Sequence, residues 1–352
     1  MLKRGVVGNY HQVRQEVPAA LSRGVSSSGT TIAKTRIRLT PPWQAEEVGA
    51  LGKFTELLAA APPVVLDGAG GTELERRGYI DRRRLWSAGA IEDVPEMVVD
   101  IHRDYIDAGA QVITTQTFTC CRRRFRKVGA EELFEPLTRH GVALAMRARR
   151  EAGRPDVLIA GSLSPLEHCY HPELAPRGDD GYSEHLESVR LLADAGVDFL
   201  MIETMNTVEE ARAALRAAQM SGLDVVVGFC CRRDGRLLSG QPVREAVRTL
   251  DGLGPAAYAI NCTPAPLTTR AAADVAAATH TPFGAYANVG EWSDGTWARV
   301  FGSEFVFNVD PDAYLQHAMG WRELGAAFVG GCCGTRPEHI HRLACAFRDG
   351  RR

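Results

Sequence analysis

The chain has 352 residues, 45% of them hydrophobic and 24% charged, with a formal net charge of −2 at pH 7. This composition is typical of a globular enzyme, and the balanced charge indicates neither a nucleic-acid-binding nor a membrane-binding surface. No apolar run reaches the about 18 residues that a membrane-spanning helix requires.

The first 55 residues differ in composition from the rest. They are basic, rich in Ser, Thr and Gly, and show no clear periodicity. Segments of this kind seldom bury enough apolar surface to fold. We expect residues 1–55 to form an N-terminal extension outside the folded domain. It is either a disordered segment, a transit peptide, or sequence that precedes a true start codon near Val48. Residues 56–352 are expected to form a single domain.

Short apolar runs recur from residue 63 onward, each followed by an amphipathic stretch. The runs are four to six residues long and apolar at nearly every position, which is typical of strands buried on both faces. They cover residues 64–67, 112–115, 157–161, 199–203, 225–230, 257–262, 283–288 and 326–330.

The stretches between these runs have helical periodicity. Thr72 with Glu75 and Thr207 with Glu210 fit the capping box that begins a helix. Glycines that are typical of helix ends follow five of the stretches: Gly109, Gly153, Gly196, Gly222 and Gly325. The predicted helices cover residues 95–108, 131–152, 184–195, 208–220, 242–250, 267–278 and 311–324.

Eight strands alternating with helices predict a parallel sheet that closes into a (β/α)8 TIM barrel, with an open doubly wound sheet as the alternative. In such barrels the chemistry lies at the carboxyl ends of the strands. Polar residues gather at those ends, among them Asp67, Thr115, Gln116, Ser162, Glu203, Cys230, Cys262, Asn288, Cys332 and Cys333. The pattern therefore favours an enzyme.

Nine cysteines are present, an odd number that indicates reduced thiols and a cytoplasmic protein. Cys262 ends the sixth strand, and Cys332 and Cys333 stand between glycines. Adjacent side chains on a strand point to opposite faces, but glycine permits positive φ angles that would turn both sulfurs to one side. Three thiolates with one open position are typical of catalytic zinc. We therefore predict a Zn²⁺ site at Cys262, Cys332 and Cys333.

The remaining cysteines are interpreted as packing residues, since free cysteine is commonly buried. They are Cys120, Cys121, Cys169, Cys230, Cys231 and Cys345.

Eight segments between residues 64 and 349 resemble the homocysteine S-methyltransferase family. The pairing of an NC motif with a downstream GGCCG motif is the most specific feature. The segments are LDGAGGTELERRG (66–78), LWSA (85–88), HRDYIDAGAQVITTQTF (102–118), AGSLSP (160–165), AGVDFLMIETM (195–205), INCTP (260–264), YANVGEW (286–292) and GGCCGTRPEHI (330–340).

The resemblance implies a (β/α)8 barrel whose zinc is held by the NC and GGCC cysteines, here Cys262, Cys332 and Cys333. It also implies that Glu203 binds the amino group of homocysteine and that the turn formed by Asp67, Gly68 and Ala69 contributes to the amino-acid site. The chain departs from the family pattern in having Gly70, Gln116 and Ala287 where Met, Asn and Pro are frequent.

The implied reaction transfers a methyl group from S-methylmethionine or S-adenosylmethionine to the zinc-bound thiolate of homocysteine, giving methionine. A free thiol with a pKa of about 8.5 is only a few per cent ionised at neutral pH, whereas a metal-bound thiol is deprotonated. Loops 163–182 and 289–309 are expected to cover the site. Aromatic residues suited to a cationic donor are Trp86, Phe118, Tyr286, Trp292 and Trp297.

Other functions remain open. A metal-dependent lyase or aldolase on the same fold would favour His and carboxylate ligands. The predicted strand ends offer thiolates and no comparable group of histidines, and the loop residues His168 and His171 are expected at the surface. A related betaine-type, thiol or selenol methyltransferase would share the same zinc site. A non-catalytic zinc-binding or methyl-carrier subunit would close the fourth zinc position with a residue of its own.

Overall fold

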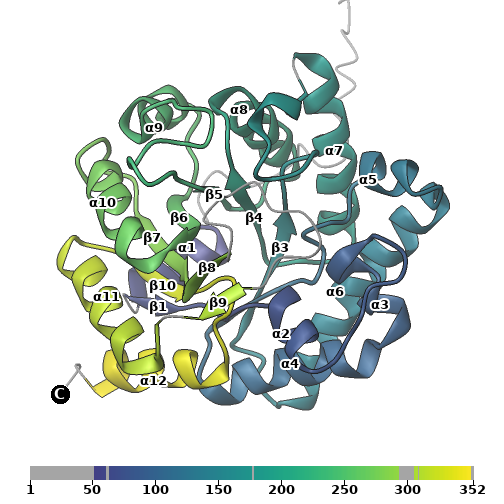
Figure 1. The fold of residues 1–352 in the computed structure, drawn as a ribbon, viewed down its shortest axis with the longest axis horizontal. Coiled ribbons are helices and arrows are strands. Elements are labelled where there is room, and N and C mark those ends of the chain that lie inside the picture. The colour runs from purple at the N-terminus through teal and green to yellow at the C-terminus, as the bar shows by residue number, and fades with distance from the viewer. Residues whose placement is uncertain (1–50, 61–62, 177, 293–304, 308, 350–352) are drawn as a thin grey trace, which may run out of the picture. The chain divides into compact units, whose positions relative to one another are not determined.

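The computed structural model describes residues 51–60, 63–176, 178–292, 305–307 and 309–349. Eight parallel strands lie at the centre and helices surround them (Figure 1). The strand order is β1-β10-β7-β6-β5-β4-β3-β2, and a parallel bridge between Leu66 and Val112 joins β1 to β2. The sheet therefore closes, which confirms the (β/α)8 barrel and excludes an open sheet.

Every predicted strand is present within a few residues of its expected bounds. The barrel strands are β1 Val64–Val65, β2 Val112–Thr114, β3 Leu158–Leu163, β4 Phe199–Met205, β5 Val225–Phe229, β6 Ala257–Pro264, β7 Phe283–Asn288 and β10 Phe328–Gly331. Two further strands, β8 Gly290–Trp292 and β9 Phe305–Phe307, pair antiparallel after β7.

The seven predicted helices are also present, as α4 Pro95–Ala108, α6 Phe134–Glu151, α7 Asp179–Asp194, α8 Val208–Ala218, α9 Val243–Asp251, α10 Ala265–Ala276 and α11 Pro311–Glu323. The helix expected to start at Thr72 is present as α2 Gly71–Arg76. The sequence analysis did not identify α1 Lys53–Ala60, α3 Ala90–Asp93, α5 Arg122–Lys127 or α12 Pro337–Asp349. Among the described helices, none has the length and apolar character needed to cross a membrane.

Local signals at the helix ends are confirmed with one exception. All five predicted terminal glycines have positive φ, from 64° to 105°. The Thr207 hydroxyl accepts a hydrogen bond from the Glu210 N–H at 3.2 Å, as a capping box requires. The capping role predicted for Thr72 is wrong, because its hydroxyl accepts instead from the Gly334 N–H at 2.8 Å. That contact ties the start of α2 to the cysteine turn after β10.

Helix α1 contributes Phe54 and Leu58 to a hydrophobic cluster formed mainly by side chains of the barrel strands. The fully buried Phe54 ring stacks on Phe199 at 4.3 Å and meets the edge of Phe328 at 5.5 Å. Such aromatic pairs stabilise a core beyond the area that they bury. The helix begins at Lys53 and so crosses the expected boundary at residue 55, whereas residues 1–50 lie outside the described part of the chain.

Candidate active site

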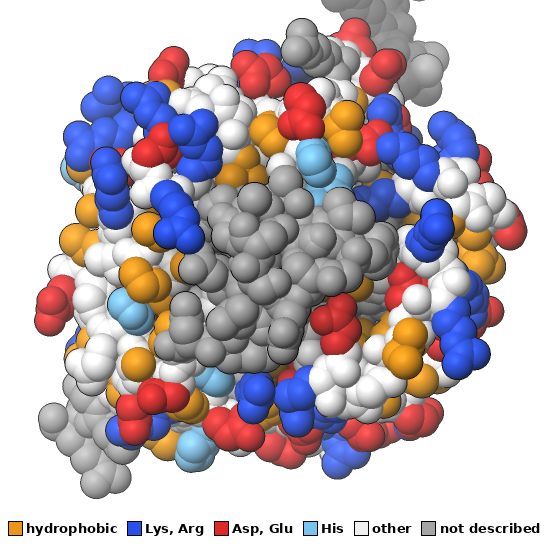
Figure 2. Space-filling model, in the orientation of Figure 1, with side chains coloured by type: hydrophobic (Ala, Val, Ile, Leu, Met, Phe, Trp, Pro, Cys, Tyr) orange, Lys and Arg blue, Asp and Glu red, His pale blue; other side chains and the backbone are white. Residues whose placement is uncertain are grey.

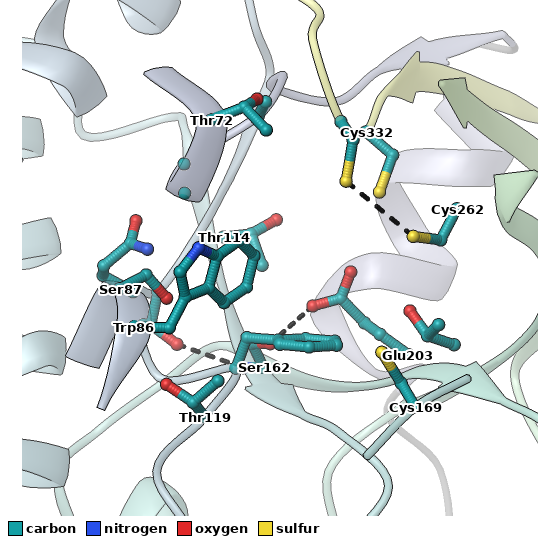
Figure 3. A pocket seen from close by; sticks show the side chains of 18 of the residues that line it. Thr72, Trp86, Ser87, Thr114, Thr119, Ser162, Cys169, Glu203, Cys262 and Cys332 are labelled. Carbon is teal, nitrogen blue, oxygen red and sulfur yellow. Dashed lines mark hydrogen bonds between the residues drawn. The ribbon is translucent and has the colours of Figure 1, made fainter. Parts of the chain in front are cut away.

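A cavity of about 670 Å³ lies at the carboxyl ends of the barrel strands, as the fold predicts. Its wall includes Asp67, Ser162, Glu203 and the cysteines 262, 332 and 333, so the polar strand-end residues converge on one space (Figure 3). Around the described rim of this face, both basic and acidic side chains are present (Figure 2).

Cys332 and Cys333 lie in a turn beyond the end of β10. The Thr335 N–H donates to the Cys332 carbonyl at 3.0 Å, and Gly334 has φ +79° at the third position of the turn, where glycine is favoured. The Cys333 N–H donates to the Asn288 side chain at 3.0 Å. Because both cysteines follow the strand, the alternation of side chains no longer separates their sulfurs.

The other glycines of this motif serve a different purpose from the one predicted. Gly330 and Gly331 do not have positive φ. Instead, a Cβ on Gly331 would lie 2.3 Å from the Thr335 hydroxyl oxygen and 2.6 Å from its Cβ. The Thr335 hydroxyl also accepts from the Ala69 N–H at 3.0 Å and donates to the Cys332 carbonyl at 2.7 Å. Gly331 is therefore required by close packing under the turn.

We expect Gly331→Ala to lower the free energy of unfolding by about 1–3 kcal/mol, because the added methyl group overpacks a site that cannot expand freely. Denaturant unfolding measures the change. Gly252→Ala is the matched control, since nothing lies within 4 Å of a Cβ at that position. Equal stability of the two variants would contradict the packing argument.

Cys262 is turned into the cavity by an irregularity in β6. The register with β7 shifts between Asn261 and Pro264, and Cys262 has φ +49°. A similar shift in β4 follows Glu203, where Thr204 has φ +60°. The Asn261 amide joins the two irregularities, accepting from the Thr204 N–H at 3.0 Å and donating to its hydroxyl at 2.8 Å. Strained residues of this kind cluster at functional sites.

The three predicted ligand sulfurs lie within 4.8 Å of one another, and those of Cys262 and Cys333 are 3.9 Å apart. Tetrahedral Zn–S bonds of about 2.3 Å would place sulfurs about 3.8 Å apart, so the group fits a metal ion of this size. Hydrogen bonding from Cys230, then Cys332 and Cys333, holds the pKa of Cys262 well below its ordinary value.

Glu203 is buried and faces the same cavity (Figure 3). The Ser162 hydroxyl donates to its carboxylate. Burial raises the pKa of Glu203 to about 7, with a further contribution from Cys262, against the lowering effect of Ser162. The carboxylate lies near the three cysteines, and no Lys, Arg or His in the described part of the chain forms an ion pair with it, which suits it to receive a cationic ligand group.

Asp67 differs from Glu203 because Thr114 on β2 engages both of its carboxylate oxygens. The Thr114 N–H and hydroxyl donate to them at 2.6 and 2.9 Å. Burial raises the pKa of Asp67 to about 8 despite these bonds. The contacts join the end of β1 to β2, so this side chain holds the turn that lines the cavity.

The raised pKa of Asp67 predicts a dependence of stability on pH. The folded state retains a proton that the unfolded chain releases above about pH 4, so this stabilisation is complete below pH 4 and is lost as the pH rises to 8. The Asp67→Asn side chain is neutral at every pH, so the stability of this variant relative to the parent should increase across this window by up to about 6 kcal/mol. Thermal and denaturant unfolding at several pH values test this, with exposed Asp100→Asn as control. A difference that is constant with pH would contradict it.

Three of the five predicted aromatic residues line the cavity: Trp86, Phe118 and Tyr286. The Trp86 and Phe118 rings meet edge-on with centroids 6.1 Å apart. Trp297 and the side chain of Trp292 lie outside the described part of the structure.

The family departures at Gly70 and Gln116 are complementary to each other. A Cβ on Gly70 would lie 2.2 Å from the Gln116 side-chain oxygen, so the longer amide occupies the space that glycine leaves. Both residues line the cavity.

Two residues of the site were not identified from the sequence, Cys169 and Tyr170. Both belong to the loop between β3 and α7 and line the cavity, and the Tyr170 hydroxyl lies 2.9 Å from the Cys262 sulfur. The expectation that this loop covers the site is confirmed, but the interpretation of Cys169 as a packing residue is wrong. The only signal was the position of both residues within that loop.

The remaining expectations for cysteine and histidine are met in part. Cys120, Cys121, Cys230 and Cys231 are buried, and the Cys230 thiol donates to the Cys262 carbonyl at 3.3 Å. His171 is half-buried and pairs with Glu173 at 2.7 Å. His168 is half-buried and lines the cavity, so it does not lie on the outer surface as expected.

Comparison with known proteins places this geometry in a family. The sequence model of the homocysteine S-methyltransferase family matches residues 64–347. Homocysteine S-methyltransferase YbgG of Bacillus subtilis (strain 168) is 30% identical over 85% of this chain and 99% of its own length. Homocysteine S-methyltransferase of Escherichia coli (strain K12) is 33% identical over 80% and 94%.

A solved structure agrees with these sequence matches. The metallated form of the homocysteine methyltransferase MmuM from Escherichia coli superposes with a TM-score of 0.72 and 28% identity, covering 84% of this chain and all of that one. The barrel, the cavity at its strand ends, the three convergent cysteines and these matches agree, and the chain belongs to the homocysteine S-methyltransferase family of enzymes.

Proposed function

We propose that this enzyme is a zinc-dependent S-methyltransferase that transfers a methyl group from S-methylmethionine or S-adenosylmethionine to homocysteine, giving methionine. The observation that carries the proposal is the convergence of three thiol sulfurs within 4.8 Å beside a buried carboxylate in one cavity. The sulfurs suit a soft metal ion, and the carboxylate suits an ammonium group.

Cys262, Cys332 and Cys333 would hold the zinc ion. Zinc bound there would keep the homocysteine sulfur ionised at neutral pH and orient it. The homocysteine sulfur then attacks the donor methyl carbon, and the bond from that carbon to the donor sulfonium breaks. Its electron pair remains on the donor sulfur, which leaves as a neutral thioether.

The other residues bind and orient the substrates. Glu203 accepts hydrogen bonds from the homocysteine ammonium group, while Ser162 fixes the orientation of its carboxylate. The turn Gly68–Gly71 lies in the cavity wall and leads into α2, where backbone N–H groups suit a carboxylate. Aromatic faces at Trp86 and Phe118 suit the cationic donor, since a sulfonium is attracted to a π-system.

The size of the cavity favours catalysis over metal storage. At about 670 Å³ it is within the range of small-molecule sites and exceeds the need of one amino acid. A carrier or structural zinc protein would fill the fourth metal position with a residue of its own and would need no such space.

Metal-loaded enzyme should be assayed with homocysteine as the acceptor and with one donor in each reaction: S-methylmethionine, S-adenosylmethionine or betaine. Mass spectrometry measures the methionine formed. The proposal predicts methionine from one of the two sulfonium donors. Turnover with betaine alone would reassign the donor, and turnover with selenocysteine but not homocysteine would reassign the acceptor. Absence of any methyl transfer would contradict the proposal.

A further inference from the structure

The loop between β3 and α7 is held on the site through hydrogen bonds to its residues 165 to 169. The Leu166 N–H donates to buried Glu210 at 2.7 Å, and the Arg124 guanidinium donates to the carbonyls of Pro165 and Glu167 at 3.1 and 2.5 Å. Beyond these, the Asn206 amide donates to the Cys169 carbonyl at 2.9 Å. Three separate elements, α5, α8 and the end of β4, therefore determine where the loop lies.

These hydrogen bonds position one side chain of the loop, that of Tyr170, next to Cys262. The turn at His168 is closed by a hydrogen bond from the His171 N–H to the His168 carbonyl at 2.9 Å. Tyr170 lies within this turn, and its hydroxyl reaches the Cys262 sulfur at 2.9 Å. Residues 92 positions apart in the chain are thereby brought into direct polar contact at the site.

The contact has a chemical consequence for a thiolate. A phenol hydroxyl is a hydrogen-bond donor, whereas a thiolate has no proton and can only accept, so the Tyr170 hydroxyl can donate to the Cys262 sulfur anion. Hydrogen bonds to charged groups are stronger than those between neutral groups. Three cysteine thiolates already outweigh the charge of a divalent ion, and a fourth thiolate from the substrate adds a further negative charge in a buried space.

We infer that Tyr170 is a positioning residue whose hydroxyl donates a hydrogen bond to the Cys262 thiolate and stabilises the additional negative charge that arrives with the thiol substrate. This inference rests on the proposed function in taking homocysteine as that substrate. Tyr170 touches a metal ligand and acts on the substrate through it.

Cobalt(II) replacement of the metal gives a readout that does not depend on turnover. A hydrogen bond lowers the energy of the sulfur lone pair, so its loss should shift the thiolate-to-cobalt charge-transfer band to longer wavelength. We expect this shift in Tyr170→Phe, together with at least about a tenfold increase in the Kd of homocysteine measured from the spectral change. Tyr182→Phe, at a half-buried tyrosine on α7 whose ring contacts Arg216, is the matched control.

A second variant keeps the test informative if Tyr170→Phe does not fold. Asn206→Ala removes the anchor of the Cys169 carbonyl and should reproduce part of the shift. Parental band position and homocysteine affinity in Tyr170→Phe would overturn the inference. If the bands shift as expected but no donor yields methionine with the parental enzyme, the proposed function fails while the hydrogen bond from Tyr170 is upheld.

Discussion

Cys332→Ala is expected to abolish both metal binding and methyl transfer. Loss of one sulfur leaves Cys262 and Cys333, with sulfurs 3.9 Å apart, as a two-ligand site. Without the metal, only a few per cent of homocysteine is thiolate at neutral pH, and its orientation is lost as well. We expect kcat/KM to fall by at least about 10³-fold. Metal content by mass spectrometry and methionine formation measure the two effects.

Cys345→Ala provides the matched control for that experiment. Cys345 lies on α12 with its sulfur 3.5 Å from His341, away from the residues of the cavity wall. This variant should retain metal and activity. Full metal content in Cys332→Ala would contradict the assignment of the ligands, and full activity with metal lost would contradict the mechanism.

Glu203→Gln is expected to impair homocysteine binding far more than metal binding. The amide has the shape of the carboxylate but lacks its charge, so the substrate ammonium loses its ionic partner in a buried site. We expect kcat/KM for homocysteine to fall by about 10²–10³-fold, mainly through KM. Steady-state kinetics and metal analysis measure this, with Glu209→Gln at an exposed position of α8 as control. Equal loss of metal would indicate a role at the metal site instead.

The raised pKa of Glu203 predicts that KM for homocysteine depends on pH. Because the pKa of Glu203 is raised to about 7, its ionised fraction falls about tenfold between pH 8 and pH 6. KM for homocysteine should rise as the pH falls through this window. Deprotonation of the substrate thiol acts in the same direction, so the informative comparison is with Glu203→Gln, whose profile should be flatter. Parallel profiles would contradict the assigned role.

Much of the fold could be predicted because it depends on short-range patterns. Buried parallel strands are continuously apolar, and the glycines after the helices adopt the positive φ that their positions require. The burial of Phe54 against Phe199 could not be predicted, since it depends on a contact between segments far apart in the sequence. The role of Thr72 was mistaken for a similar reason, because its hydroxyl accepts a hydrogen bond from Gly334, which follows the neighbouring strand β10 but lies far away in the sequence.

The candidate site, too, could be predicted only in part from the sequence. Cysteines at strand ends are visible in the sequence, and the structure brings Cys262 close to Cys333. The backbone irregularities at Thr204 and Cys262 are not visible, because a positive φ at a residue other than glycine depends on tertiary contacts such as those of Asn261. Tyr170 was missed because the position of its loop depends on hydrogen bonds to Arg124, Glu210 and Asn206, which belong to other elements of the fold.

X-ray absorption at the zinc edge, with and without homocysteine, tests the central claim most directly. The claim is that Cys262, Cys332 and Cys333 hold zinc with one position open to the substrate sulfur. It predicts three sulfur ligands and one lighter ligand in the resting enzyme, and four sulfur ligands after homocysteine is added. A sulfur count that homocysteine leaves unchanged, or a reduced protein that binds no zinc, would contradict it.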